Sequence, residues 1–254
     1  MLRKSVLLVS FTCVVFLAAA IISCGGSSSG SKACTGSYNV VGDWNLTIND
    51  AEGVAGAIDS AGEALFFDNV GDVAAMPTIT GACSFSGTVT VYDSSLGTPP
   101  DTSASASVTG NVTSSNSIGG TVTTSSGPVN FSLTPITALS GSPTVPSTAM
   151  QAEVEAATTP DILTLTFSGT SSSMSFTGGD RFQCTASGTF SQAGASNVYD
   201  FTITFSGTGC SATGTVSGLG LESNTDYFNM NGGAAGTYLY GMSSSSAFVM
   251  EIFP

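Results

Sequence analysis

Seven residues in the second half of the chain, "YDFTITF" at 199–205, alternate between large apolar and polar side chains. A period of two places the apolar side chains on one face of an extended strand and the polar ones on the other. Shorter runs with the same alternation occur at 44–48, 129–133 and 163–167, and clusters of glycine and serine separate them as antiparallel turns require. The pattern predicts an all-β chain of about ten to twelve strands.

Antiparallel strands in this number need closure or a second sheet to protect their edges. We therefore expect an antiparallel β-barrel or a two-sheet sandwich. Two internal matches suggest that it consists of two related halves: C-x-x-S-G-T begins at Cys83 and at Cys184, and Gly-Thr-Val occurs at 120–122 and 214–216. In a chain this rich in serine, glycine and threonine, matches of this length also arise by chance.

One stretch between the two halves differs from the rest. "STAMQAEVEAA" at 147–157 contains good helix formers, and Thr148 with Gln151 fits a capping box. We therefore predict a short helix there. The predicted organisation is a first β half at 39–140, a connector with this helix at 141–160, and a second β half at 161–254.

The chain begins with features of a secretory signal. Arg3 and Lys4 form a positive start, and the chain is almost wholly apolar from there to Ile22. Length alone also allows a membrane-spanning helix, which needs about 17–25 residues. No basic cluster follows the apolar run, however, and a glycine–serine tract does.

The residues that end this run, Ile21-Ile22-Ser23-Cys24, resemble the lipobox of bacterial lipoproteins. The resemblance implies that the leader 1–23 is removed and that Cys24 carries the lipid. The glycine–serine composition after Cys24 predicts that 24–38 is a flexible tether. A membrane holds two or three acyl chains firmly, whereas one chain gives only marginal binding. Because Gly25 is not the aspartate associated with inner-membrane retention, the resemblance further implies a bacterial envelope protein at the outer membrane.

Charge and composition exclude several functions. From Cys24 onward the chain has 17 acidic residues and two basic ones, Lys32 and Arg181, so its net charge is −15. Such a chain repels nucleic acid. It has no histidine, which removes the commonest general base and most zinc or iron sites. We predict no catalytic residue, no cofactor and no metal, and we interpret the oxygen-rich stretch at 224–233 as a turn.

Four cysteines remain beyond the lipobox, and an even number in an exported chain predicts disulfides. Four cysteines permit three pairings. We favour Cys34–Cys83 and Cys184–Cys210, because these partners are nearest in sequence. A zinc site would need CxxC spacing or histidine, and neither is present.

Gly42-Asp43-Trp44 opens the first alternating run and looks like the G-x-W motif of lipocalins. The resemblance implies a barrel whose floor the tryptophan closes, with an arginine of the last strand packed across it. The last predicted strands contain no arginine. The competing interpretation is a buried aromatic residue at the start of an ordinary strand.

Two functional hypotheses follow. The first is a non-catalytic module that binds a small apolar ligand or a glycan inside the barrel or sandwich. The second is a structural or protein-interaction lipoprotein that takes a partner by edge-strand addition. An internal cavity favours the first, and a filled core with an exposed apolar patch favours the second. The candidate ligand-binding residues are Phe66, Phe67, Arg181, Tyr227, Tyr238 and Tyr240.

Overall fold

The computed structural model describes ten segments of the chain: 36–49, 51–67, 73–92, 103–136, 147–155, 161–193, 198–210, 212–223, 236–242 and 247–253. The predicted leader 1–23, Cys24, Cys34 and Tyr227 lie outside these residues. A search of the described residues finds no helix with the length and hydropathy needed to cross a membrane.

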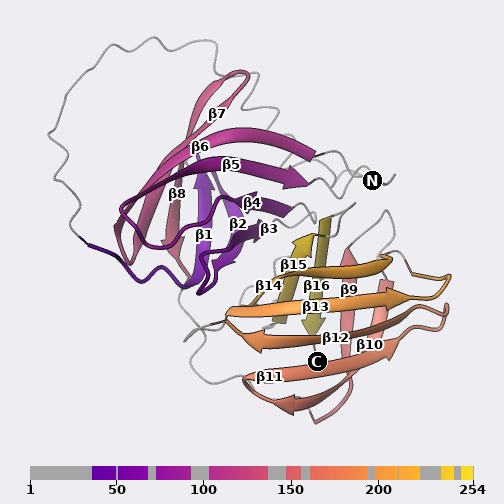
Figure 1. Cartoon of the computed structure of the whole chain (residues 1–254). Helices are drawn as coiled ribbons and strands as arrows, with labels where there is room; N and C mark the ends of the chain where they lie inside the picture. The colour runs from indigo at the N-terminus through magenta and orange to yellow at the C-terminus, as the bar shows by residue number, and fades with distance from the viewer. Residues whose placement is uncertain are drawn as a thin grey trace, which may run out of the picture.

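The first eight strands form a closed antiparallel barrel in chain order (Figure 1). Closure comes from β8, which pairs with β1 so that Phe131 lies opposite Ile48. The strands are β1 (Gly42–Ile48), β2 (Ala51–Ile58), β3 (Ala64–Phe67), β4 (Val73–Met76), β5 (Ser84–Tyr92), β6 (Ser103–Ser114), β7 (Ser117–Thr124) and β8 (Gly127–Pro135).

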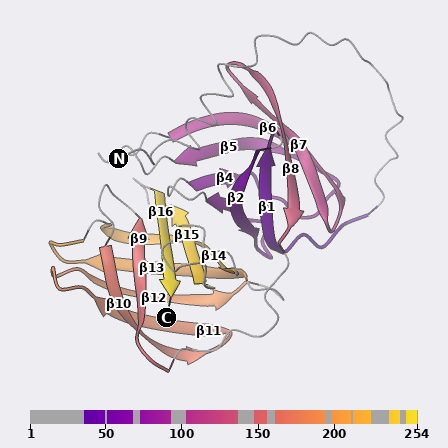
Figure 2. The same ribbon diagram turned by 180° about the vertical axis from the view of Figure 1, so that it is seen from behind.

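The next eight strands form a second closed barrel beside the first (Figures 1 and 2). Here β9 closes the sheet, because it pairs with β10 on one side and with β16 on the other. The strands are β9 (Met150–Glu155), β10 (Asp161–Thr170), β11 (Ser173–Gly179), β12 (Thr185–Gln192), β13 (Val198–Ser206), β14 (Gly214–Ser223), β15 (Gly236–Met242) and β16 (Ala247–Phe253).

The predicted all-β class is confirmed, and of the two expected architectures the chain adopts the barrel, twice. The described segments contain sixteen strands, more than the ten to twelve expected. The difference comes in part from β3 and β4, which are four residues each and apolar throughout. A strand buried on both faces shows no alternation, so a period of two does not reveal it.

The predicted helix at 147–157 is wrong, because residues 150–155 form strand β9. The residues of this segment also fit the period of two of a strand, and Ala152 and Val154 are fully buried in the second barrel. Closure of that barrel requires a strand between β10 and β16. Tertiary pairing therefore outweighs the helix propensity of this short segment.

Each barrel has its own apolar interior. The alternation at 199–205 is confirmed, since Tyr199, Phe201, Ile203 and Phe205 all belong to the core of the second barrel and Asp200 points outward. In the first barrel Trp44 is 2% exposed, and its indole Nε1 donates a hydrogen bond to the carbonyl of Val40 at 2.9 Å. The first barrel thus buries the tryptophan of the G-x-W sequence.

Several phenylalanine rings pack over a glycine on the neighbouring strand. Gly110 lies opposite Phe85 in the first barrel, and Gly188 lies opposite Phe176 in the second. A Cβ atom added at either glycine would collide with the ring. These glycines therefore make room for rings close to the barrel wall, a known use of glycine in curved sheets.

The two internal sequence matches fall on strands that are seven apart. C-x-x-S-G-T leads into β5 and into β12, and Gly-Thr-Val lies in β7 and in β14. Each barrel has eight strands, so an offset of seven means that the matching strands do not hold the same ordinal position in the two barrels: β2 of the first barrel corresponds to β9, the first strand of the second. Strand β16 then takes the place between β15 and β9 that β1 takes between β8 and β2.

The predicted pairing of Cys184 with Cys210 is present, with the two Cα atoms 4.6 Å apart. The bond joins the turn before β12 to the turn after β13. Cys83 is also disulfide-bonded, and its predicted partner Cys34 lies outside the described residues.

Candidate functional site

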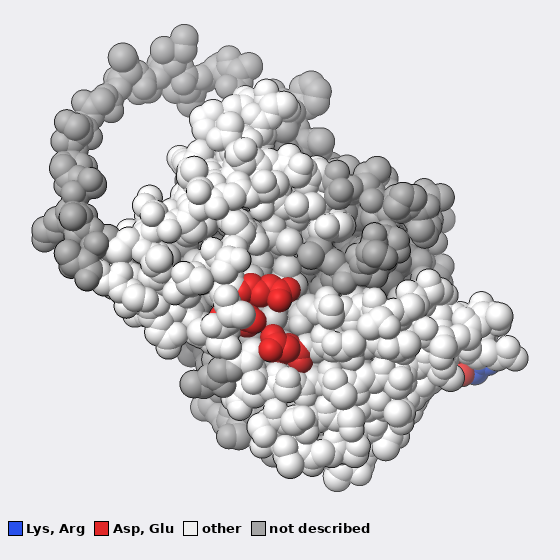
Figure 3. Space-filling view, in the orientation of Figure 1, with Lys and Arg blue, Asp and Glu red and all other residues white. Residues whose placement is uncertain are grey.

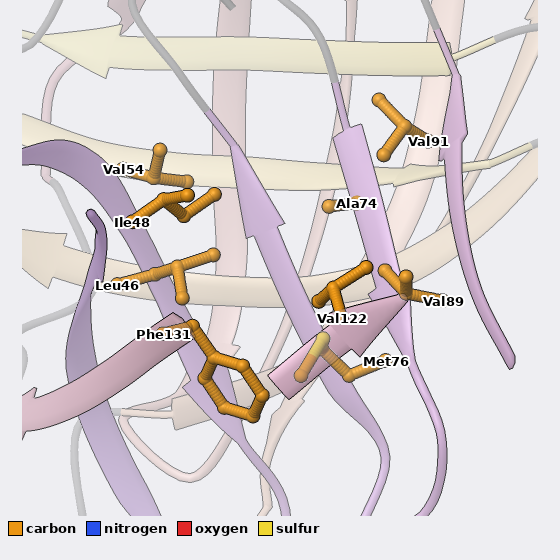
Figure 4. A pocket seen from close by; sticks show the side chains of 9 residues that line it. All are labelled: Leu46, Ile48, Val54, Ala74, Met76, Val89, Val91, Val122 and Phe131. Carbon is orange, nitrogen blue, oxygen red and sulfur yellow. The ribbon is translucent and has the colours of Figure 1, made fainter. Parts of the chain in front are cut away.

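A cavity lies inside the first barrel, between side chains that six of its strands contribute (Figure 4). No polar atom faces it, so every contact that it offers comes from carbon or from the sulfur of a methionine. The lining residues are Leu46, Ile48, Val54, Ala74, Met76, Val89, Val91, Val122 and Phe131.

The lining follows from the period of two in the strands. Three strands each place two lining residues at positions i and i+2, as Val89 and Val91 do on β5. Phe131 on β8 lies opposite Gly120 on β7, and a Cβ atom at Gly120 would meet its ring. The glycine therefore lets this aromatic side chain lie against the wall beside the open space.

The cavity measures about 20 Å³. A water molecule needs two to four polar partners in addition to this much space, so an apolar cavity of this size stays dry. Sites for whole drug-sized ligands are far larger, about 300–1,000 Å³. The open space has only the size of a small group such as the end of a side chain, and anything bulkier requires the wall to move. Met76 is unbranched and only partly buried, which makes it the most adaptable part of the lining.

The interior of the second barrel is built from aromatic rings in contact. Phe167 and Phe176 have ring centroids 5.8 Å apart, and Phe190 meets Tyr199 edge to face at 5.4 Å. Phe190 also lies 6.2 Å from Phe176, so the rings form one continuous group. Aromatic pairs at these separations are favourable beyond the area they bury.

Of the candidate residues whose side chains the structure describes, which are Phe66, Phe67 and Arg181, none lines the cavity. Phe66 belongs to the interior of the first barrel at a different place, and Phe67 points outward against the second barrel. Tyr238 and Tyr240 lie in β15 opposite Leu221 and Leu219, and their side chains are not described. Sequence reasoning favoured large aromatic residues, whereas the cavity exists because valine and alanine leave space that larger residues would fill.

Arg181 lies in the exposed turn between β11 and β12, away from the interior of either barrel. Its guanidinium carbon is 4.6 Å from the ring centroid of Phe182. The carboxylate of Asp180 accepts hydrogen bonds from the backbone N–H groups of Phe182 and Cys184, at 2.8 and 2.9 Å. Asp180 thus shapes the turn, and Arg181 stacks on its neighbouring ring.

Among the residues that the structure describes, no group of three or more histidine, cysteine, aspartate or glutamate side chains is arranged to hold a metal ion.

Comparison with known proteins gives little further guidance. No family model matches the chain, and no curated protein matches it. Among solved structures, the isotype 1 transferrin binding protein B from serogroup B Neisseria meningitidis aligns over 80% of this chain with 10% identity and a TM-score of 0.25. The alignment spans 52% of that protein's chain, about half of its length.

Proposed function

We propose that this chain is a non-catalytic, lipid-anchored protein of the bacterial envelope, and that its first barrel binds the hydrocarbon end of an amphiphilic ligand. The observation that carries the binding role is the cavity inside that barrel, whose lining exposes no polar atom. A hydrocarbon chain leaves water favourably, by about 0.8 kcal/mol for each buried CH₂ group, and needs no hydrogen-bond partner.

The same lining argues against a glycan inside the barrel. Sugar hydroxyl groups that enter a buried site need hydrogen-bond partners, and an unsatisfied one costs about 1–3 kcal/mol. The cavity supplies none. Within this proposal a polar headgroup stays outside the barrel, in water.

A role in protein interaction has less support in the described residues. Both sheets close on themselves, so they present no free edge to which a partner strand could add. The large hydrophobic side chains exposed there are Ile162 and Phe182, on β10 and on the β11–β12 turn. Two exposed side chains are too few to make the contiguous apolar patch of several hundred Å² that marks an interaction surface.

Binding is tested with a long-chain fluorescent fatty acid and the mature chain. Ala74→Val adds two methyl groups to the lining, and we expect it to weaken binding at least tenfold. Thr88→Val introduces the same valine side chain on the exposed outer face of β5 and should leave affinity unchanged. Absence of binding by the unaltered chain would refute the ligand role, and equal effects of the two substitutions would place the ligand elsewhere.

The anchor rests on the lipobox-like sequence that ends at Cys24. We expect the native chain to enter the detergent phase on phase separation, and Cys24→Ser to move it to the aqueous phase. Cys13→Ser changes a cysteine of the removed leader and serves as the control, with no effect on partition. Detergent partition that survives Cys24→Ser would mean that no acyl group is attached there.

A further inference from the structure

The two barrels are joined by an apolar contact that we call the junction. The first barrel contributes Ala55, Ala57, Leu65, Phe67 and Val73 from β2–β4, and the second contributes Ala193, Val198, Leu219 and Leu221. These residues are 3% exposed or less. The two barrels are therefore packed against each other through an apolar interface, and are not joined by a flexible linker alone.

Three carboxylates gather where the two barrels meet. Asp59 and Glu63 come from the β2–β3 turn of the first barrel, and Asp200 comes from β13 of the second, two residues beyond Val198 of the junction. Figure 3 shows a patch of acidic side chains between the barrels, separate from the acidic side chain that lies beside a basic one at the edge of the view.

The β2–β3 turn holds its two carboxylates firmly. Asp59 is 5% exposed, and its Oδ1 accepts the backbone N–H of Glu63 at 2.6 Å. The backbone N–H of Asp59 in turn donates to the carbonyl of Glu63 at 3.0 Å. The turn therefore cannot easily carry these charges away from the second barrel.

No basic side chain offsets these charges within the described part of the chain, where the one lysine or arginine is Arg181 in the β11–β12 turn. Partial burial raises the pKa of Glu63 above its ordinary value, and the charges of Asp59 and then Asp200 raise it further. Burial also raises the pKa of Asp200, with the charge of Asp59 adding to the effect. The raised pKa of Glu63 on the first barrel thus includes repulsion from Asp200 on the second, and the raised pKa of Asp200 includes repulsion from Asp59 on the first.

We propose that protons regulate how firmly the two barrels pack: the junction tightens when carboxylates across it are protonated, and it loosens when they ionise. The sign follows from the raised pKa values of Glu63 and Asp200. Their contribution to stability is fully present below the ordinary values of 4.5 and 3.8, and it is lost as the pH rises through the raised values. Acid therefore stabilises the contact. Because both side chains remain exposed, salt weakens the effect.

A double-mutant cycle across the junction tests this directly. Glu63→Gln and Asp200→Asn each remove one charge without much change in shape. In the mature chain at pH 7 and low salt, we expect each substitution to raise the urea midpoint, and the double variant to gain less than the two gains added. This coupling should disappear near pH 4 and shrink in 0.5 M salt.

Asp161→Asn on β10 is the matched control in the second barrel, paired in its own cycle with Glu63→Gln. The charges that raise the pKa of Glu63 are those of Asp59 and Asp200, so Glu63 and Asp161 should show no coupling at either pH. Coupling between Glu63 and Asp200 that is absent at pH 7, or unchanged near pH 4, overturns the proposal. Neither result depends on ligand binding or on the lipid anchor.

Discussion

The two barrels have the same strand number and closure, yet their interiors differ in kind. The second barrel is filled by contacting rings such as Phe176 and Phe190. The first is lined around its cavity mainly by valine, leucine, isoleucine and alanine, with Phe131 held against the wall. Branched aliphatic side chains reach less far from the wall than rings do. An eight-stranded barrel is just wide enough for side chains to fill or to hold one small ligand, so side-chain size decides which of these happens.

The barrels also differ in what covers their outer faces. Strands β2 and β4 of the first barrel are buried on both sides: Val54 and Ala74 face the cavity, while Ala55 and Val73 face the junction. The wall of the cavity is therefore also part of the contact with the second barrel. The exposed residues of β13, by contrast, alternate with its core residues in the ordinary way.

The largest expected difference between the interiors concerns loss of an aromatic ring. Phe176→Ala removes a side chain that is 1% exposed and contacts two other rings, so we expect a loss of about 3–5 kcal/mol in the free energy of unfolding. Phe131→Ala removes a ring that already borders empty space, and its loss should be smaller by about 1 kcal/mol or more. Urea unfolding measures both, and equal losses would show that the first barrel is packed as tightly as the second.

The disulfide of the second barrel comes next in size. Cys184 and Cys210 are 26 residues apart, and cross-linking a loop of that length stabilises by about 3.5 kcal/mol in the chain-entropy model. Replacing both by serine should lower the stability of the second barrel by about that amount, and calorimetry should show its transition at a lower temperature. The transition of the first barrel should move less, and a shift as large in both would mean that the barrels unfold as one unit.

The smallest effect is the sharpest test of the comparison. Ala74→Val and Ala186→Val make the same change on inward positions of the two barrels. In the first barrel the added methyl groups enter open space, and we expect a gain of about 1 kcal/mol. In the second they meet packed side chains, and we expect a loss of about 1–3 kcal/mol. Chemical denaturation of the two variants side by side gives the two signs, and a loss in both would contradict the cavity.

Some features of the fold could be predicted from local patterns. The alternation at 199–205 predicted the strand β13 and its buried face, because a period of two directly records which side chains face a core. Proximity in sequence predicted the Cys184–Cys210 bond. Where both faces of a strand are buried, as in β3, the side chains do not alternate, so the local pattern did not predict the strand.

The sequence by itself determined that this chain is a strongly acidic antiparallel β protein, since periodicity and composition can be read without knowing which distant residues are in contact. Only the tertiary structure decided that β9 is a strand, because a barrel closes through pairing with β10 and β16. It alone also placed the cavity and brought Asp200 to Glu63. Empty space and charge proximity depend on residues far apart in the chain, and no local pattern encodes the distance between them.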